Sequence, residues 1–361
     1  MKEKVVLGLS GGVDSSASAI KLLDEGYEVI ALYINNFDSK QDDDLNYQDA
    51  LRVANKLQIE FHSVNLVNEN KDYVFDYFIN EYKNGRTPSP CIMCNKNIKF
   101  KAFLDIAFNY NATKIAMGHY ARTKTIDGIT YLLKGVDEKK DQTYFLAMLT
   151  QEQLSHVIFP VGDMVKPDVR KLALEKELVT AKKSESMDIC FIGKEKFNDF
   201  IQNYIPINKG LMKTLDGKII GKHNGLQFYT IGQRKGLNIG GLNGYSNDAW
   251  FVIGKDLKTN TLLVGQGFYN PYLYSNRAIC ENYNFNSVIP SEDKEYQAKF
   301  RYRAIDKKAK IKILDDKYFE ITYEDERAVT PGQACVIYDG DICLGGGIIS
   351  EVYKDNDRRR Y

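Results

Sequence analysis

The sequence predicts an α/β protein in which a parallel sheet wrapped by helices is followed by two β-rich regions. Three observations lead to this fold class. Over roughly the first 190 residues, short apolar runs alternate with helical patterns, as in βαβ units. After about residue 200, helical periodicity fades, and glycine and short aromatic or β-branched runs dominate. A chain of 361 residues also exceeds one typical core of about 150, which predicts two or three domains.

The first half contains the elements of a parallel sheet. Apolar runs predict strands at 5–9, 29–34, 59–66 and 114–117. Helical patterns occupy roughly 15–25, 47–57, 73–82 and 95–108. In such a sheet, ligands bind at the carboxyl ends of the strands, so we expect the functional site there.

The second half reads as short strands separated by turns. A small central domain is predicted from runs at 226–231, 249–253 and 261–264. A C-terminal β-barrel or sandwich is predicted from runs at 297–302, 310–313, 319–323, 334–338 and 342–349. We therefore place the three domains at 1–198, 199–270 and 271–361.

Composition narrows the functional class. The chain is 43% apolar and carries 49 Lys and Arg against 48 Asp and Glu, so any nucleic-acid partner must be held by a local basic patch. No run of 18 apolar residues or signal peptide is visible, which predicts a cytoplasmic protein with no membrane partner. Six cysteines do not form a dense secreted framework and favour reduced, reactive or metal-binding thiols.

The segment 8–16, GLSGGVDSS, places a glycine turn between a strand and a helix. Backbone N–H groups and the helix dipole favour a phosphate at such a turn, and the hydroxyls of Ser10 and Ser15 can add donors. The loop has no Lys and does not fit the Walker pattern. An ordinary strand-to-helix turn rich in Gly and Ser is the structural alternative.

Cysteines supply the second signal. In TPSPCIMCNK, residues 87–96, Cys94 is expected at the start of a helix, where the helix end, Lys96 and Lys99 would lower the thiol pKa. Cys190, in MDICFIG, is a third candidate, although Cys91 and Cys94 could instead be inert. A zinc site is disfavoured because no second CxxC or His pair completes it. Three other cysteines lie in apolar, strand-like runs and are expected in the core: Cys280, Cys335 and Cys343.

The densest basic run is 299–312, in which seven of 14 residues are basic and aromatic residues are interleaved. Such a run suits RNA phosphates, but a solvated strand face is the equally simple alternative.

Taken together, these blocks resemble the tRNA-specific 2-thiouridylases of the PP-loop ATP pyrophosphatase superfamily. The matching blocks span nearly the whole chain: 8–15, 94–103, 118–122, 140–145, 188–193, 223–241 and 328–341. The resemblance implies an N-terminal PP-loop domain that splits ATP to AMP and pyrophosphate while adenylating C2 of the wobble uridine. Sulfur then displaces AMP and gives 2-thiouridine.

The resemblance also implies site residues. Cys190 would carry a persulfide, and Cys94 would attack it, releasing sulfide and leaving a transient disulfide with Cys190. Asp14 would help to hold Mg²⁺ beside the pyrophosphate. The implied ATP-binding residues are Gly8, Leu9, Ser10, Gly11, Gly12, Val13, Asp14, Ser15, Ile34 and Gly118.

The implied partners are tRNA and a sulfur donor. The family acts on wobble-uridine tRNAs, here expected to be those for Lys, Glu and Gln, and takes persulfide from a cysteine desulfurase or a sulfur relay protein. The implied tRNA-binding residues are Ser89, Pro90, Cys91, His119, Lys140, Asp141, Gln142, Arg301, Tyr302, Arg303 and Gln333.

One departure opens a second mechanism. The family usually has Asp at the position of Cys91, and a thiol with a pKa near ~8.5 replaces a carboxylate near ~3.9 poorly. Cys91, Cys94 and Cys190 could instead ligate a [4Fe-4S] cluster whose open iron holds hydrosulfide. Two rival functions are a PP-loop ligase that forms an amide from an adenylated carboxylate, and a non-catalytic RNA-binding module. Neither has a use for Cys94 and Cys190.

Overall fold

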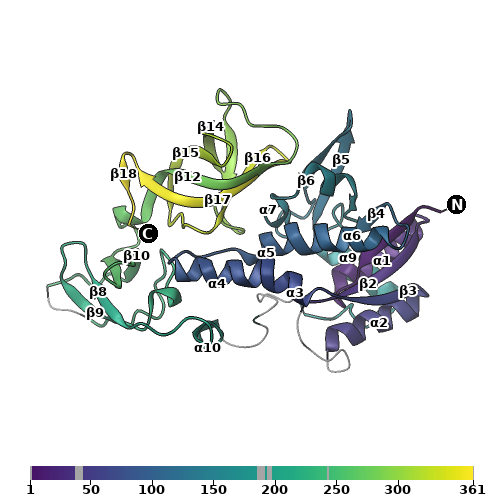
Figure 1. Ribbon diagram of the computed structural model, residues 1–361, viewed down its shortest axis with the longest axis horizontal. Helices are drawn as coiled ribbons and strands as arrows, with labels where there is room; N and C mark the ends of the chain where they lie inside the picture. The colour runs from purple at the N-terminus through teal and green to yellow at the C-terminus, as the bar shows by residue number, and fades with distance from the viewer. Residues whose placement is uncertain (1, 37–43, 185–191, 193–196, 242–243, 361) are drawn as a thin grey trace.

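The described residues, 2–36, 44–184, 192, 197–241 and 244–360 of a computed structural model, contain three sheets (Figure 1). The parallel sheet of the first half has the order β3-β2-β1-β4-β7. Its strands are β1 (Lys4–Gly8), β2 (Glu28–Asn35), β3 (Glu60–Asn65), β4 (Lys114–Ala116) and β7 (Val157–Ile158). The chain winds outward from β1 to β3 and returns to the other side at β4. The carboxyl ends of β1 and β4 therefore flank a topological switch point, where α/β sheets bind ligands.

Side chains alternate between the two faces of this sheet. Val5 and Leu7 face α1 (Val13–Asp24), α2 (Leu45–Leu57) and α9 (Lys166–Glu175). Val6 lies in the core on the opposite face, together with Phe100 and Phe103. This alternation is what a strand buried on both sides requires, and it confirms the wrapped sheet.

Two long helical runs connect β3 to β4. The first joins α3 (Val67–Asn70), the π-helix η2 (Lys71–Phe75) and α4 (Asp76–Lys83). The second, which we call the thiol helix, joins α5 (Pro90–Met93), the π-helix η3 (Cys94–Ala102) and α6 (Phe103–Phe108). Shorter helices follow at α7 (Thr143–Leu146) and α8 (Gln151–Ser155).

The central region contains a four-stranded sheet of order β10-β11-β8-β9. Its strands are β8 (Gly210–Lys213), β9 (Ile219–His223), β10 (Trp250–Asp256) and β11 (Thr261–Gln266), preceded by α10 (Phe197–Gln202). The strand predicted at 226–231 is wrong. This run holds the 3₁₀-helix η4 (Leu226–Phe228), because Gly225 turns the chain at φ 140° and lets Leu226 enter the central core.

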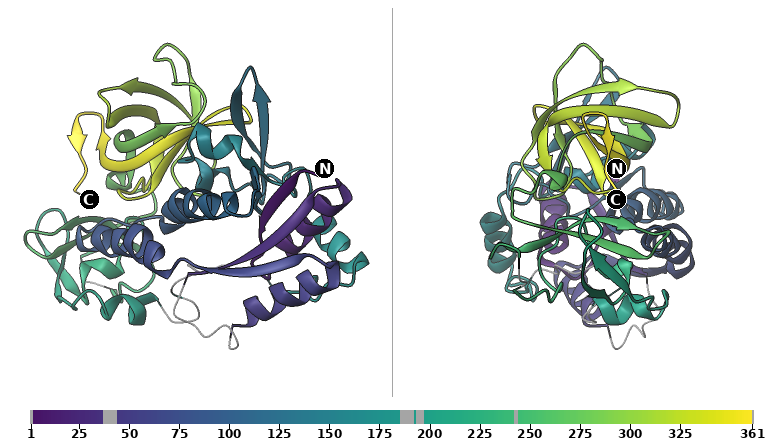
Figure 2. Two further views of the ribbon diagram at one scale, coloured as in Figure 1. Left: turned by 45° about the vertical axis from the view of Figure 1, so that its right-hand side comes forward. Right: turned by 90° about the vertical axis from the view of Figure 1, so that its left-hand side faces the viewer.

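The C-terminal strands form a closed antiparallel barrel (Figure 2). A 3₁₀-helix, η5 (Pro271–Leu273), precedes it. The barrel strands are β12 (Tyr274–Phe285), β13 (Tyr296–Lys299), β14 (Lys307–Ile313), β15 (Tyr318–Arg327), β16 (Ala334–Asp339) and β17 (Ile342–Lys354), and the short β18 (Asp357–Arg358) pairs with β17. Closure follows because β12 pairs with both β15 and β17. Cys280, Cys335 and Cys343 are fully buried, which confirms them as core residues.

A hairpin of the first half joins this barrel. β5 (Ala121–Ile126) and β6 (Ile129–Lys134) extend the same sheet, since β6 pairs with β17. One apolar core also spans the junction and includes Phe103 of the thiol helix together with Val336 and Tyr338 of β16. The domain limits at 198 and 270 stay predictions. None of the described helices is long and apolar enough to cross a membrane.

Candidate nucleotide and thiol site

The nucleotide loop, residues 8–15, leaves β1 and enters α1 at the switch point. Gly11 has φ +69°, and an added Cβ would lie 2.1 Å from the backbone oxygen of Asn46. This position therefore accepts glycine alone. Gly12 is the N-cap of α1, so no side chain covers the first N–H groups of the helix. An anion can bind at such an uncovered helix start.

Serine hydroxyls fix the shape of the loop. The Ser15 Oγ accepts a hydrogen bond from the Ser10 N–H at 3.2 Å and donates to the Gly12 carbonyl at 3.1 Å. The Ser10 and Ser15 hydroxyls lie 3.1 Å apart, and the Ser16 hydroxyl donates to the Gly12 carbonyl at 2.8 Å. These hydrogen bonds hold the loop in its observed shape.

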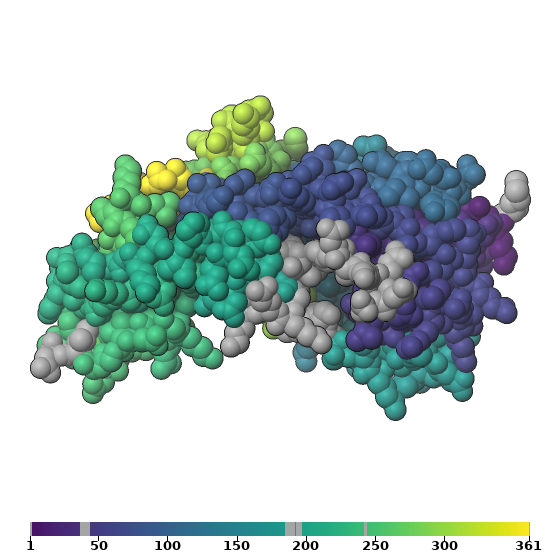
Figure 3. All heavy atoms as spheres, turned by 60° about the horizontal axis from the view of Figure 1, so that its bottom comes forward, coloured from purple at the N-terminus to yellow at the C-terminus, as the bar shows by residue number. Residues whose placement is uncertain are grey.

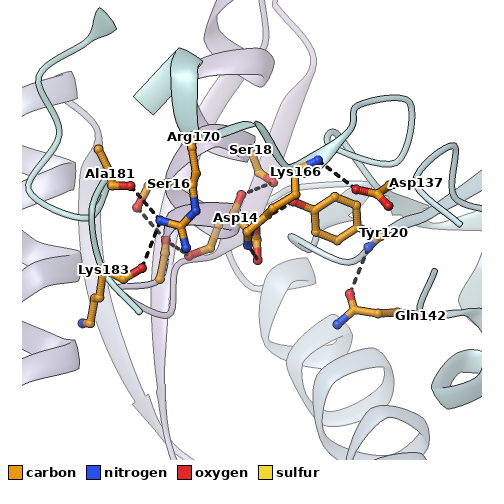
Figure 4. A network of polar contacts seen from close by, with 12 residues as sticks. Asp14, Ser16, Ser18, Tyr120, Asp137, Gln142, Lys166, Arg170, Ala181 and Lys183 are labelled. Carbon is orange, nitrogen blue, oxygen red and sulfur yellow. Dashed lines mark hydrogen bonds and ion pairs between the residues drawn. The ribbon is translucent and has the colours of Figure 1, made fainter. Parts of the chain in front are cut away.

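Asp14 takes part in an ion pair that the sequence did not indicate. The Lys166 Nζ donates to both Asp14 carboxylate oxygens, at 2.7 and 2.9 Å, and the Tyr120 hydroxyl donates to one of them at 2.8 Å (Figure 4). Lys166 is the first residue of α9 and is 8% exposed. Asp14, which the resemblance implies as a Mg²⁺ ligand, is thus already paired with a cationic side chain.

A second unexpected lysine clamps the loop itself. The Lys183 Nζ donates to the Gly11 carbonyl at 2.9 Å, to Asn46 Oδ1 at 2.9 Å and to Asp49 Oδ2 at 2.6 Å. Arg170 holds the chain beside it, donating to the backbone carbonyls of Ala181 and Lys183 (Figure 4). Both lysines contact residues more than 130 positions away, so no local pattern could have revealed them.

The carboxyl end of β4 packs against the loop. An added Cβ on Gly118 would lie 2.8 Å from the backbone nitrogen of Ser15, so the two segments touch through their backbones. At the end of β1, a Cβ on Gly8 would lie 2.6 Å from the Met117 sulfur and 3.7 Å from Phe103. Through Phe103, the thiol helix reaches the loop.

His119 is the next link to the thiol helix. Its ring centroid lies 5.6 Å from that of Phe100, which belongs to η3, and 6.2 Å from that of Phe159. Burial, with a smaller contribution from Lys99, lowers the His119 pKa well below its ordinary value, so the ring is neutral at pH 7. Within the described part of the chain, its Nδ1 has no hydrogen-bond partner.

The thiol helix begins earlier than expected. Its N-cap is Ser89 and its first residue is Pro90, so Cys91 lies in the first turn and Cys94 one turn later. The expectation that Cys94 starts a helix is therefore wrong. Proline suits the first helical position because its missing N–H would be unpaired there in any case. Cys91 and Cys94 are three residues apart, which places them on one helix face.

Cys94 lies in an apolar cluster. It is 4% exposed and packs with Leu66, Val74 and Ile98. Ile34, at the carboxyl end of β2, packs against the same cluster. A predicted nucleotide-lining residue and a predicted catalytic thiol thus meet in one contact region. Cys190 lies outside the described residues.

Comparison with known proteins agrees with this geometry. Residues 3–194 match the family described as "tRNA methyl transferase HUP domain", 198–266 the "tRNA methyl transferase PRC-barrel domain", and 275–349 the "Aminomethyltransferase beta-barrel domain". The chain is 48% identical to "tRNA-specific 2-thiouridylase MnmA" of Acholeplasma laidlawii, with all of both chains covered. It is 50% identical to the protein of that name from Ligilactobacillus salivarius, again over both full lengths. The chain belongs to the tRNA-specific 2-thiouridylase family.

Solved structures are more distant. A 4-thiouridine synthetase bound to RNA and ATP aligns with 56% of this chain and 50% of its own, at 18% identity and a TM-score of 0.34. The NMN synthetase of Francisella tularensis aligns with 51% of this chain and 66% of its own, at 16% identity and a TM-score of 0.33.

The 2-thiouridylase resemblance singled out residues 140–142 as RNA contacts. Asp141 is 7% exposed, and one of its oxygens accepts hydrogen bonds from the Gly135 N–H at 3.1 Å and the Thr143 hydroxyl at 3.0 Å. Burial raises its pKa. Gln142 Oε1 accepts from the Tyr120 N–H at 3.0 Å, while Lys140 is half-buried. Asp141 and Gln142 thus brace the segment beside Tyr120, and their contact with RNA stays a prediction.

The predicted RNA contacts at 301–303 also differ in how far they are engaged within the protein. Arg301 donates to the Ala328 carbonyl at 2.7 Å and to Thr330 Oγ1 at 2.8 Å, so it already supports the barrel. The Tyr302 ring lies 4.4 Å from that of Phe145, and Arg303 is exposed. The predicted RNA contacts with Arg301, Tyr302 and Arg303 stay predictions.

Proposed function

We propose that this protein is an ATP-dependent sulfurtransferase that converts the wobble uridine of tRNA to 2-thiouridine. The observation that carries the proposal is the meeting of the nucleotide loop and the thiol helix at one sheet edge, through Gly118, His119 and Ile34. Full-length relatives at 48–50% identity are named for this activity. A uridine adenylated at the loop would lie next to Cys94, the thiol that takes part in replacing the C2 oxygen with sulfur.

The nucleotide loop would serve the first half-reaction. The uridine C2 oxygen attacks the α-phosphorus of ATP, pyrophosphate leaves, and the oxygen becomes part of a phosphate ester that is a far better leaving group. The start of α1 and the hydroxyls of Ser10 and Ser15 would bind the phosphates. Lys183 would hold Gly11 in place, and Lys166 would neutralise Asp14, which otherwise repels ATP.

Two thiols would serve the second half-reaction. The Cys94 thiolate attacks the Cys190 sulfur of a Cys190 persulfide, forming the Cys94–Cys190 disulfide and releasing hydrosulfide. Hydrosulfide attacks C2 of the adenylated uridine, AMP leaves, and the C2–S bond replaces C2–O. A cellular thiol reductant then restores both cysteines. The neutral ring of His119, next to the thiol helix, could exchange a proton during these steps.

The iron–sulfur alternative keeps the same substrate and product. Cys91 and Cys94 lie on one helix face and would be two of the three ligands, with Cys190 as the third. Among the described residues, no group of three or more His, Cys, Asp or Glu side chains could hold a metal ion. Cys190, the third candidate ligand, lies outside those residues. Iron and acid-labile sulfide measured after anaerobic purification distinguish the routes, since the persulfide route expects neither.

We propose that the substrates are the tRNAs for Lys, Glu and Gln, that the reaction takes place in the cytoplasm, and that a cysteine desulfurase or sulfur relay protein donates the sulfur.

To test the proposed function, the protein is given ATP, a wobble-uridine tRNA transcript and a persulfide donor, and 2-thiouridine is measured by nucleoside mass spectrometry. Cys190→Ala should abolish the product, whereas Cys335→Ala, a change in the buried barrel core, should leave it. Undiminished thiolation by Cys190→Ala contradicts the persulfide role. If AMP release requires ammonia and a carboxylate instead of tRNA, the result favours the rival function, a PP-loop ligase that forms an amide.

A further inference from the structure

A short stretch of chain, residues 85–89, connects α4 to the thiol helix; we call it the connecting segment. It ends at Ser89, the N-cap of the helix that carries Cys91 and Cys94. Whatever fixes this segment also fixes the start of that helix. In the space-filling view of Figure 3, indigo atoms of the first half lie against teal atoms of the central region. Phe78 of α4 and Phe200 of α10 share one apolar cluster there.

The central domain holds the first residue of the connecting segment. The N–H of Arg86 donates to the Glu81 carbonyl and that of Gly85 to the Tyr82 carbonyl, a Schellman ending for α4, with Gly85 at φ +74°. The Nζ of Lys255, from β10, donates to the Gly85 carbonyl at 2.8 Å. Lys255 is only 5% exposed. A buried lysine of the central region thus bonds the backbone just beyond the end of α4.

The barrel holds the next two residues. The Arg86 guanidinium pairs with Glu281 of β12. The Thr87 N–H donates to the Pro331 carbonyl at 3.0 Å, and Gln333 Nε2 donates to the Thr87 carbonyl at 2.6 Å. Both backbone groups of Thr87 are therefore bound by the loop before β16. Gln333, predicted as an RNA contact, here uses its amide to position backbone.

These contacts tie both β-rich domains to one short segment at the base of the thiol helix. Burying an amine against one neutral carbonyl is costly, and burial lowers the Lys255 pKa to about 7. An apolar side chain would avoid that cost, but it could not donate the hydrogen bond that holds the Gly85 carbonyl.

We propose that the connecting segment couples tRNA bound by the barrel to the position of Cys91 and Cys94, with Lys255 and Gln333 as positioning residues. This inference rests on the proposed function. Tilting the start of the thiol helix moves both thiols relative to the nucleotide loop. The reacting geometry is therefore set from the RNA-binding side of the molecule.

The test compares Lys255→Met with Lys258→Met. Both remove an ammonium group and keep an unbranched apolar chain, but Lys258 is exposed. Three quantities are measured: the tRNA dissociation constant, the single-turnover rate of 2-thiouridine formation, and the effect of tRNA on alkylation of Cys91 and Cys94, read by mass spectrometry. In the wild type, tRNA should change the alkylation rates. In Lys255→Met, tRNA should no longer change the alkylation rates, and the single-turnover rate should fall at least about tenfold. The tRNA dissociation constant should stay within about twofold of the wild-type value. Lys258→Met should match the wild type.

Gln333→Met provides a second, independent variant. As a positioning residue, Gln333 should affect rate and alkylation but leave tRNA affinity unchanged, whereas as an RNA contact it should weaken affinity. If Lys255→Met does not fold, this variant carries the test.

The inference is overturned if the folded variants keep the wild-type rate and the tRNA effect on alkylation, or if they lose only tRNA affinity. Failure of the wild type to form 2-thiouridine would contradict the proposed function instead.

Discussion

At the residue scale, the nucleotide loop works through close contacts and opposite charges. Lys166 and Lys183 bring positive charge to a loop whose own sequence has none. The Lys166–Asp14 pair is partly shielded from water, with side chains 10% and 31% exposed, so solvent screens it less than a surface pair.

We expect Lys166→Met to weaken ATP binding. Removing the ammonium leaves Asp14 uncompensated beside the triphosphate site, and the repulsion should raise the KM for ATP about tenfold, roughly 1.4 kcal/mol. The KM for ATP is measured from the rate of AMP formation in the presence of tRNA. Lys171→Met, an exposed lysine of the same helix, is the matched control. An unchanged KM in Lys166→Met would show that the pair is irrelevant to ATP.

Glycine 11 offers a second comparison. Gly11→Ala places a Cβ 2.1 Å from the Asn46 oxygen at φ +69°, so the loop must deform and ATP-dependent AMP release should be lost. Gly26→Ala has a similar φ, +89°, but meets nothing within 4 Å. It should cost about 1 kcal/mol of stability and keep activity. Equal activity of the two variants would argue against the loop as the nucleotide site.

The sequence predicted these residues unevenly. The sequence singles out Gly11, Gly12 and Ser15 because strand, turn and helix follow one another in a short stretch. Lys166 and Lys183 were missed because their partners are brought near only by the sheet, and neither lies in a motif.

At the element scale, the helix that carries the thiols gains its position from outside the first half. The sequence predicted a helix over 95–108, but the structure starts it at Pro90, since proline is compatible with the first helical turn. The connecting segment that precedes this helix is held by contacts with Lys255, Gln333 and Glu281. Local patterns cannot show contacts of this kind.

Lys255 should also give the fold a specific pH dependence. Burial lowers its pKa from 10.5 to about 7 in the folded protein, so between pH 7 and 10 the unfolded chain binds more protons and stability rises with pH. From pH 7 to 9 this amounts to about 2 kcal/mol. Urea unfolding at both pH values should show an increment in the wild type and Lys258→Met that Lys255→Met lacks. The same increment in all three proteins would mean that Lys255 is not the group responsible.

At the scale of the whole molecule, the parallel-sheet half and the barrel are joined by shared strands and a shared core. The hairpin β5–β6 joins the barrel sheet, and one apolar core spans the thiol helix and β16. The sequence predicted the three-part order, and strand spacing and turn residues predicted a barrel or sandwich in its last part. It could not predict that strands from the first half extend the barrel sheet, because pairing partners far apart in sequence leave no local signal.

If the whole molecule works in this way, ATP cleavage and sulfur insertion are one coupled reaction on tRNA. The most direct measurement counts AMP and 2-thiouridine in the same single-turnover sample, with and without a wobble-uridine tRNA. We expect one AMP for each 2-thiouridine, and neither product with a tRNA whose wobble base is cytidine. Thiolation without AMP, or AMP formed at the same rate without tRNA, would contradict adenylation of the uridine at the loop that follows β1.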